Sequence, residues 1–139
     1  MKHVVIVEDN ELIAKYLRYI LEHDGGYRVS VTESGDEAIA LARDPDTIAV
    51  LVDVSLRATQ HEGRYIDGLA LARLLKADEL AAKVPVIIAT AHAMTGDRER
   101  FLEESGADGF IRKPVVDSGE LLSLIHKLEQ KNLDGSRKR

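Results

Sequence analysis

Short β-branched runs alternate with segments of helical periodicity along almost the whole chain, and this alternation constrains the fold more than any other feature. Residues 4–7 are all Val or Ile, and apolar side chains then recur at helical spacing over residues 12–21. The same succession of an apolar run and a helical segment repeats until the chain nears its end. It predicts an α/β fold, in which a doubly wound parallel sheet of five strands is covered by five helices on its two faces.

The strands are expected at residues 4–7, 27–31, 48–53, 84–90 and 109–112, with helical segments near 12–21, 36–43, 69–75, 97–105 and 121–128. Asp9 or Asn10 is suited to cap the first of these helices, which Gly25-Gly26 can end. The helix at 97–105 offers only Phe101 and Leu102 for burial, so we expect it to be weakly anchored.

Length and composition are those of one compact domain. The domain is predicted to span residues 1–131, and residues 132–139 are predicted to form a charged, disordered tail. The chain has no Cys, which excludes thiol catalysis and Cys-ligated metal sites. A net charge of −5 disfavours nucleic-acid binding, and no apolar run is long enough for a signal peptide or a membrane span. We therefore expect a cytoplasmic protein with neither nucleic acid nor membrane as a partner.

Polar residues end, or directly follow, four of the predicted strands. They are Glu8-Asp9, Asp53, Thr90 and Lys113-Pro114. Ligands of doubly wound sheets bind beyond the carboxyl ends of the strands, so these side chains are expected to converge. Grouped carboxylates repel one another unless a cation lies among them, and oxygen ligation by a few carboxylates suits Mg²⁺. An adjacent ammonium and hydroxyl would suit the oxygens of a phosphoryl group.

Taken together, these residues and Phe110 resemble the receiver domains of two-component response regulators, over about residues 3 to 130. The resemblance implies a flavodoxin-like sheet of strand order 2-1-3-4-5. It implies that Asp53 accepts a phosphoryl group from a kinase phosphohistidine and that Lys113 binds that group. It implies a Mg²⁺ site made by Glu8, Asp9, Asp53 and the backbone carbonyl of Ser55.

The resemblance also implies a switch and partners. Thr90 and Phe110 correspond to the switch residues of the family, with Thr90 moving toward the phosphoryl group and the ring of Phe110 turning inward. The partners would be a histidine kinase or phosphotransfer protein and a downstream protein target. The target would contact the face made by the fourth helix, the fifth strand and the fifth helix. Such a protein is not an enzyme in the ordinary sense, because it catalyses only its own phosphorylation and dephosphorylation.

The chain departs from the family in the loop after Asp53. Arg57 stands where the family usually has Pro, and the matching Gly, Gly68, lies several residues further on than expected. The expanded polar loop, residues 57–67, is interpreted either as a cover or kinase contact beside Asp53 or as a tolerated surface insertion. His92, two residues after Thr90, lies where family members tune the access of water to the acyl phosphate, and the sign of its effect stays open.

Three classes of function share this fold: a phosphoryl-accepting switch, an enzyme or cofactor protein, and an interaction module. A flavin carrier needs a Gly/Ser/Thr-rich anion cradle after the first strand, where this chain has Glu-Asp-Asn, and a haloacid-dehalogenase-type phosphatase needs an acid where Ser55 stands. A receiver-like interaction module that works without phosphorylation remains the alternative to a phosphoryl-accepting switch. Each polar residue has an ordinary structural role open to it, such as helix capping for Glu8-Asp9. Asp53, at the end of an apolar run, is the hardest to explain in this way.

Overall fold

The computed structural model describes residues 1–57, 59–91 and 96–137, and for residues 134–137 it describes the backbone alone. The strands are β1 (His3–Val7), β2 (Arg28–Thr32), β3 (Thr47–Asp53), β4 (Gln60–His61), β5 (Arg64–Tyr65), β6 (Val86–Thr90) and β7 (Gly109–Arg112). The helices are α1 (Glu11–Tyr19), α2 (Gly35–Ala42), α3 (Gly68–Ala77), α4 (Asp97–Ser105) and α5 (Ser118–Arg137). Two short helical segments are η1 (Ile20–Asp24), a π-helical continuation of α1, and η2 (Ala81–Lys83), a 3₁₀ turn.

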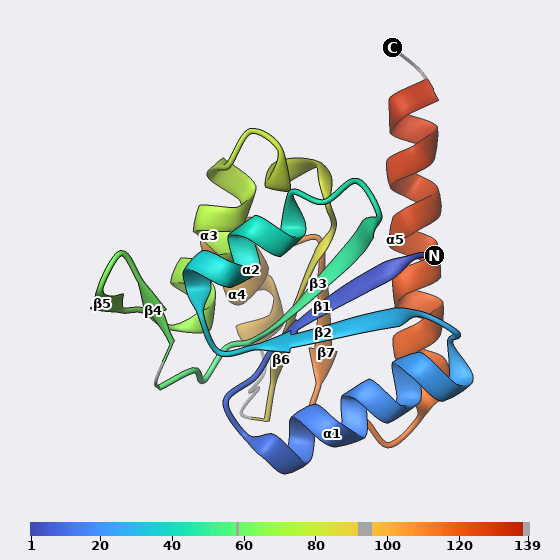
Figure 1. Ribbon diagram of the computed structural model, residues 1–139, viewed down its shortest axis with the longest axis horizontal. Coiled ribbons are helices and arrows are strands. Elements are labelled where there is room, and N and C mark those ends of the chain that lie inside the picture. The colour runs from blue at the N-terminus through green and yellow to red at the C-terminus, as the bar shows by residue number, and fades with distance from the viewer. Residues whose placement is uncertain (58, 92–95, 138–139) are drawn as a thin grey trace.

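Five parallel strands form the central sheet in the order β2-β1-β3-β6-β7. This is the 2-1-3-4-5 order implied by the family resemblance, with β6 and β7 as the fourth and fifth strands of the sheet. Figure 1 shows α1 and α5 on one face of the sheet and α2, α3 and α4 on the other. The predicted doubly wound α/β fold with five helices is therefore confirmed.

Each central strand divides its side chains between two hydrophobic cores, because successive residues of a strand point to opposite faces. In β3, Val50 and Val52 pack with α2 and α3. Leu51, between them in the chain, packs on the other face with Leu121 and Ile125 of α5. Burial on both faces explains why the central strands are apolar throughout, and why a polar residue ending one of them is conspicuous.

Side-chain caps fix where several helices begin. Asn10 Oδ1 accepts a hydrogen bond from the backbone N–H of Ile13 at 3.1 Å, so Asn10 is the cap of α1 among the two candidates that the sequence offered. Ser34 caps α2 and Asp67 caps α3 in the same way. These caps begin α1 and α2 directly after the carboxyl ends of β1 and β2, and they begin α3 after the loop that follows β3. The polar residues gather at this edge of the sheet.

Helix α4 is the least buried of the helices that cover the sheet. Phe101 and Leu102 are only half-buried, and Ser105 is the one buried residue of this helix. The small buried apolar area agrees with the weak anchoring expected from its sequence. Across the described ranges, no helix combines the length and the apolar character that crossing a membrane requires.

Two regions differ from the sequence-based predictions. The expanded loop contains a small antiparallel hairpin, β4–β5, whose two-residue strands are too short to produce a recognisable alternation. The chain after residue 131 was predicted to be a disordered tail, but α5 continues to Arg137. Once Leu121 and Ile125 anchor that helix, each further residue adds a backbone hydrogen bond at little cost, so the helix extends beyond its buried stripe.

Candidate functional site

Three carboxylates meet at the carboxyl edge of the sheet. Glu8 and Asp9 follow β1, and Asp53 ends the neighbouring strand β3. One carboxylate oxygen from each residue lies within 4.8 Å of the others. Glu8 and Asp53 are buried, and Asp9 is half-buried. The parallel pairing of β1 with β3 brings these strand ends together, so the predicted convergence of the acids is present.

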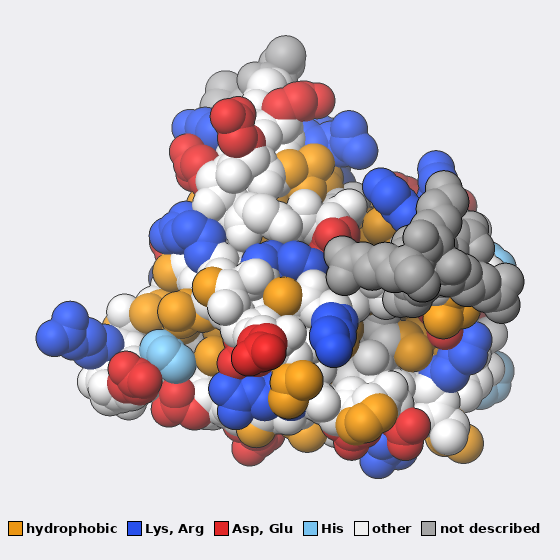
Figure 2. All heavy atoms as spheres, turned by 90° about the horizontal axis from the view of Figure 1, so that it is seen from above, with side chains coloured by type: hydrophobic (Ala, Val, Ile, Leu, Met, Phe, Trp, Pro, Cys, Tyr) orange, Lys and Arg blue, Asp and Glu red, His pale blue; other side chains and the backbone are white. Residues whose placement is uncertain are grey.

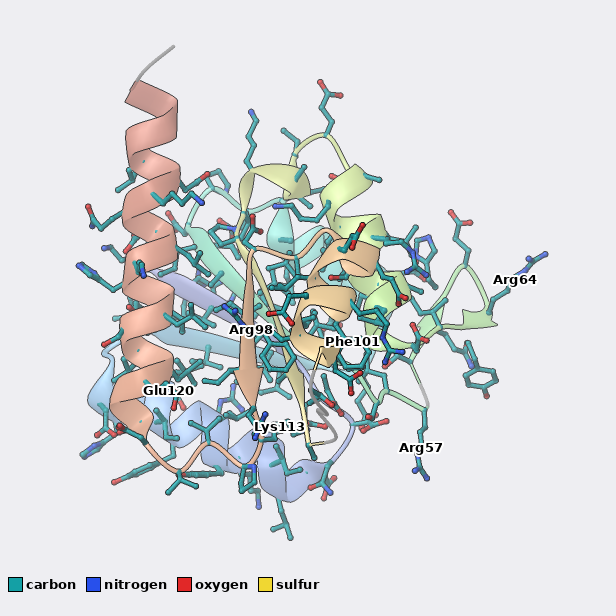
Figure 3. All side chains as sticks on the ribbon, turned by 180° about the vertical axis from the view of Figure 1, so that it is seen from behind. Arg57, Arg64, Arg98, Phe101, Lys113 and Glu120 are labelled. Atoms are coloured by element: carbon teal, nitrogen blue, oxygen red, sulfur yellow. The ribbon has the colours of Figure 1, made fainter. Side chains whose placement is uncertain are left out.

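Lys113 supplies the positive charge of the cluster. It follows β7, and its Nζ lies 2.6 Å from Glu8 Oε1 and 3.3 Å from Asp53 Oδ1. Only 8% of the Lys113 side chain is exposed, so solvent screens the charge of its ammonium only weakly. The peptide bond between Lys113 and Pro114 is cis. Figure 3 shows Lys113 at the end of β7 that faces this edge of the sheet.

Backbone N–H groups fix the orientation of all three carboxylates. Asn10 N donates to Glu8 Oε2 at 3.3 Å, and Ser55 N donates to Asp53 Oδ1 at 3.1 Å. Arg57 N donates to Asp9 Oδ2 at 2.9 Å, which ties the beginning of the expanded loop to the acid after β1. The sequence predicted a role for the carbonyl of Ser55. The contact described here is made by its N–H, and the carbonyl as a metal ligand stays a prediction.

The protonation of Glu8 reflects its crowded surroundings. Burial raises the pKa of the Glu8 carboxyl above its usual value, because desolvation disfavours the charged form. The hydrogen bond from Lys113 opposes this rise, and the nearby Asp53 carboxylate adds to it. The carboxylates of the cluster therefore repel one another, and a bound cation would reduce that repulsion.

Gly68 allows α3 to begin directly against the end of β3. A Cβ placed on this residue would lie 1.9 Å from the Asp53 carbonyl oxygen and 2.7 Å from Val54 Cα. Its backbone N–H also donates to the Val54 carbonyl at 3.2 Å. The sequence identified Gly68 only as a displaced family glycine. The close approach involves residues brought together by the loop between them, and no sequence pattern reports it.

Thr90 and Phe110 lie on neighbouring strands. Thr90 ends β6 and is buried, and its carbonyl accepts a hydrogen bond from Lys113 N at 2.9 Å. Phe110, in β7, is half-buried and packs against the core on the α2–α3–α4 face. The backbone therefore links the predicted switch threonine directly to the predicted phosphoryl-binding lysine.

The hairpin of the expanded loop lies away from the acidic cluster, although the loop begins beside it at Arg57. The hairpin packs on the beginning of α2, where Glu62 N donates to the Asp36 carboxylate at 3.3 Å. In Figure 3, Arg64 of the hairpin points away from the body of the molecule and from Lys113. The hairpin therefore does not cover Asp53. His92 lies outside the described residues.

His3 is a buried polar residue that lies outside the acidic cluster. It begins β1 with 1% of its surface exposed, and its ring nitrogens lie 3.1 Å from Thr47 Oγ1 and 2.7 Å from Ser30 Oγ. Burial lowers the pKa of the His3 imidazole, and the nearby Arg28 lowers it further. His3 joins β1 to the strands on both sides of it, at the opposite end of β1 from the acids.

The donor set of the cluster suits a hard divalent cation. All its donors are carboxylate oxygens, and they converge from two strand ends with backbone N–H groups fixing their orientation. Few carboxylates with room for further oxygen ligands are typical of Mg²⁺ sites. Glu8, Asp9 and Asp53 therefore fit the predicted ion in chemistry and in separation.

Comparisons with known proteins agree with this geometry. Residues 4–126 match the response regulator receiver domain family. The chain is 40% identical over 114 residues to the polar-differentiation response regulator DivK of Brucella ovis, covering 82% of this chain and 85% of that protein.

Solved structures give the same result. One similar structure is the receiver domain of the sensor histidine kinase PA1611 from Pseudomonas aeruginosa, which was solved with magnesium coordinated in its active site cleft. It matches this chain with a TM-score of 0.76 and 29% sequence identity, over 93% of this chain and 98% of that one. A CheY-like receiver domain protein from Methanospirillum hungatei has a TM-score of 0.75 and 26% identity, covering 97% of this chain and 98% of that one.

Proposed function

The chain belongs to the response regulator receiver domain family, which functions in two-component signalling, and from this membership we propose that phosphorylation of Asp53 operates it as a switch. The observation that carries the proposal is the meeting of Glu8, Asp9 and Asp53 within 4.8 Å of one another. Lys113 Nζ lies 3.3 Å from the Asp53 carboxylate. A carboxylate nucleophile beside a cation site and an ammonium is suited to accept a phosphoryl group.

The phosphoryl group would come from the phosphohistidine of a histidine kinase or a phosphotransfer protein. The Asp53 carboxylate attacks phosphorus, an O–P bond forms, and the N–P bond breaks with its electron pair returning to the imidazole. Glu8, Asp9, Asp53 and the Ser55 carbonyl would hold Mg²⁺, which would supply positive charge to offset the charge of the phosphoryl oxygens. Lys113 binds one of those oxygens through its ammonium. The chain thus catalyses only its own phosphorylation and the later hydrolysis.

The signal would leave through the α4–β7–α5 face. Thr90 moves toward the phosphoryl group, and Phe110 turns inward from its half-buried position. The small buried area of α4 supports this route, because a helix with few apolar contacts repacks at low cost. A downstream protein that prefers one arrangement of this face would read the state of Asp53.

Intact mass after incubation with acetyl phosphate tests the proposal. We expect the gain of one phosphoryl group with Mg²⁺, none after chelation, and none in Asp53→Asn. Asp46→Asn is the matched control, since Asp46 is an exposed aspartate outside the acidic cluster, and it should label like the parent. A folded parent chain that takes no phosphoryl group would favour the alternative, an interaction module that works without phosphorylation.

The route to the output face has its own test. The chain has no Trp, so Phe110→Trp introduces a single tryptophan whose emission can be excited selectively. Its emission should change when acetyl phosphate and Mg²⁺ are added, and Lys113→Ala in the same background should remove that change. An emission change that survives loss of Lys113 would count against the role given to the ammonium.

A further inference from the structure

The β4–β5 hairpin and the exposed side of α3 enclose a groove that contains none of the acidic cluster. Its volume is about 790 Å³. Ile66, Ala70, Leu74 and Ala77 give it an apolar lining, and Arg64 and Arg73 add two positive charges. In Figure 2 the hairpin forms the left edge of the molecule, and hydrophobic side chains gather beside it.

The hairpin wall of the groove packs against the beginning of α2. A Cβ on Gly35 would lie 2.8 Å from the Gln60 carbonyl oxygen, so the two backbones are in close contact. His61 Nδ1 lies 2.8 Å from Asp36 Oδ1, and Glu62 N donates to the same carboxylate. A wall fixed in this way gives a preformed groove, which spares a ligand the entropy of ordering the loop.

The α3 side of the groove has the shape that an entering helix needs. Ala70, Leu74 and Ala77 follow one another at spacings of four and three residues, which places them on one stripe of α3. The two alanines keep the stripe shallow, so another helix axis can approach to about 8–10 Å.

The charged residues that line the groove favour a ligand of negative charge. Among the described residues, neither Arg64 nor Arg73 forms an ion pair with a carboxylate, although Arg73 Nη1 donates to the Glu104 carbonyl. Glu62 is the one carboxylate that lines the groove. Two unpaired guanidinium groups on a chain of net charge −5 favour an acidic ligand at this place.

We propose that this groove is a docking site for an amphipathic helix of a partner protein, whose apolar stripe packs on Ile66 and Leu74 and whose flanking acids pair with Arg64 and Arg73. Helix-in-groove recognition uses this combination of an apolar lining and charged flanks. The proposal goes beyond the phosphorylation switch, since no residue of the groove takes part in phosphoryl transfer. It gives the expanded loop a function that a tolerated insertion lacks.

The test uses a defined probe on the full chain. The probe is a 14-residue helical peptide with Leu at i, i+3, i+4 and i+7 and Glu at the flanking positions, and its counterpart carries Lys at those positions. Amide shifts of residues 60–66 and 70–77 should move with the Glu peptide. Arg64→Glu should weaken that binding about fivefold. Arg98→Glu, on exposed α4, should leave it unchanged.

Three results would overturn the proposal. The first is that the Lys peptide binds as tightly as the Glu peptide. The second is that the shifts map to α1 or to the α4–β7–α5 face. The third is that residues 60–66 and 70–77 shift with protein concentration alone, which would make a second copy of the chain the occupant. Because Arg64 is exposed on a turn-flanking strand, its substitution leaves the fold available for all three measurements.

Discussion

Replacing Gly68 by Ala tests how the fold positions the phosphorylation site. The added methyl group would lie 1.9 Å from the Asp53 carbonyl oxygen, about 1 Å inside the closest separation that non-bonded atoms tolerate. Both nearby groups, the Asp53 carbonyl and Val54 Cα, belong to the backbone, so no flexible side chain can turn away. Either α3 or the end of β3 must move, at a cost of about 1–3 kcal/mol of unfolding free energy.

The same movement would displace the nucleophile. Asp53 Oδ1 lies 3.3 Å from Lys113 Nζ, and a shift of roughly 1 Å at the end of β3 would spoil that alignment. We expect phosphorylation by acetyl phosphate to slow on the order of tenfold to a hundredfold. Urea unfolding and the time course of mass labelling measure the two effects on one sample.

Gly119→Ala is the matched control. A Cβ on this exposed residue of α5 would meet only Asp117 Oδ1, at 3.1 Å, and Ala favours the helix. Its stability and labelling rate should equal or exceed those of the parent. If Gly68→Ala were as stable as Gly119→Ala and labelled as quickly, the close approach of α3 to β3 would not be what positions Asp53.

Three further predictions concern charge. Lys113→Ala leaves the buried Asp53 carboxylate without its ammonium, so the free energy of urea unfolding without Mg²⁺ should fall by about 3 kcal/mol. Mg²⁺ should restore part of that loss. If variant and parent responded equally to Mg²⁺, the prediction would be wrong. The pKa of His3 is lowered, so its stabilising effect is complete above pH 6.5 and is lost as pH falls below that value. Between pH 7.5 and 5.5, the melting temperature should therefore fall less in His3→Gln than in the parent chain. The hydrogen bond with Arg43 lowers the pKa of Asp78 to about 2. The stability that Asp78 contributes is therefore present above pH 3.8 and is lost as pH falls toward 2. Carboxyl NMR of Arg43→Gln should show the pKa of Asp78 rising toward 3.8, and an unchanged pKa would exclude that hydrogen bond as the cause.

Most of the fold follows from patterns that are local in the sequence. The apolar runs that end at Val7, Asp53 and Thr90 identify strands buried on both faces, and the polar residues after them mark the edge where the site forms. The acids and Lys113 were predicted because the topology of a doubly wound sheet fixes where strand ends meet. Their meeting needed no knowledge of side-chain packing.

Other features depend on contacts between distant segments, and local patterns do not report them. His3 is the third residue of the chain, and its burial follows from β2 and β3 pairing on both sides of β1. The constraint at Gly68 arises from the path of the loop after β3. The hairpin has strands of two residues each, held by contacts to Asp36 of α2 rather than by propensity. The extension of α5 to Arg137 depends on its anchored first half.

The division of each strand between two cores has a consequence for how substitutions combine. Val50 and Leu51 are adjacent in the chain, but they serve separate cores. Leu51 shares its core with Ile125, which lies near the other end of the sequence. Losses of stability should therefore combine non-additively for Leu51 with Ile125 and nearly additively for Val50 with Ile125. A map of energetic coupling in this chain would follow the two faces of the sheet, and proximity in the sequence would predict it poorly.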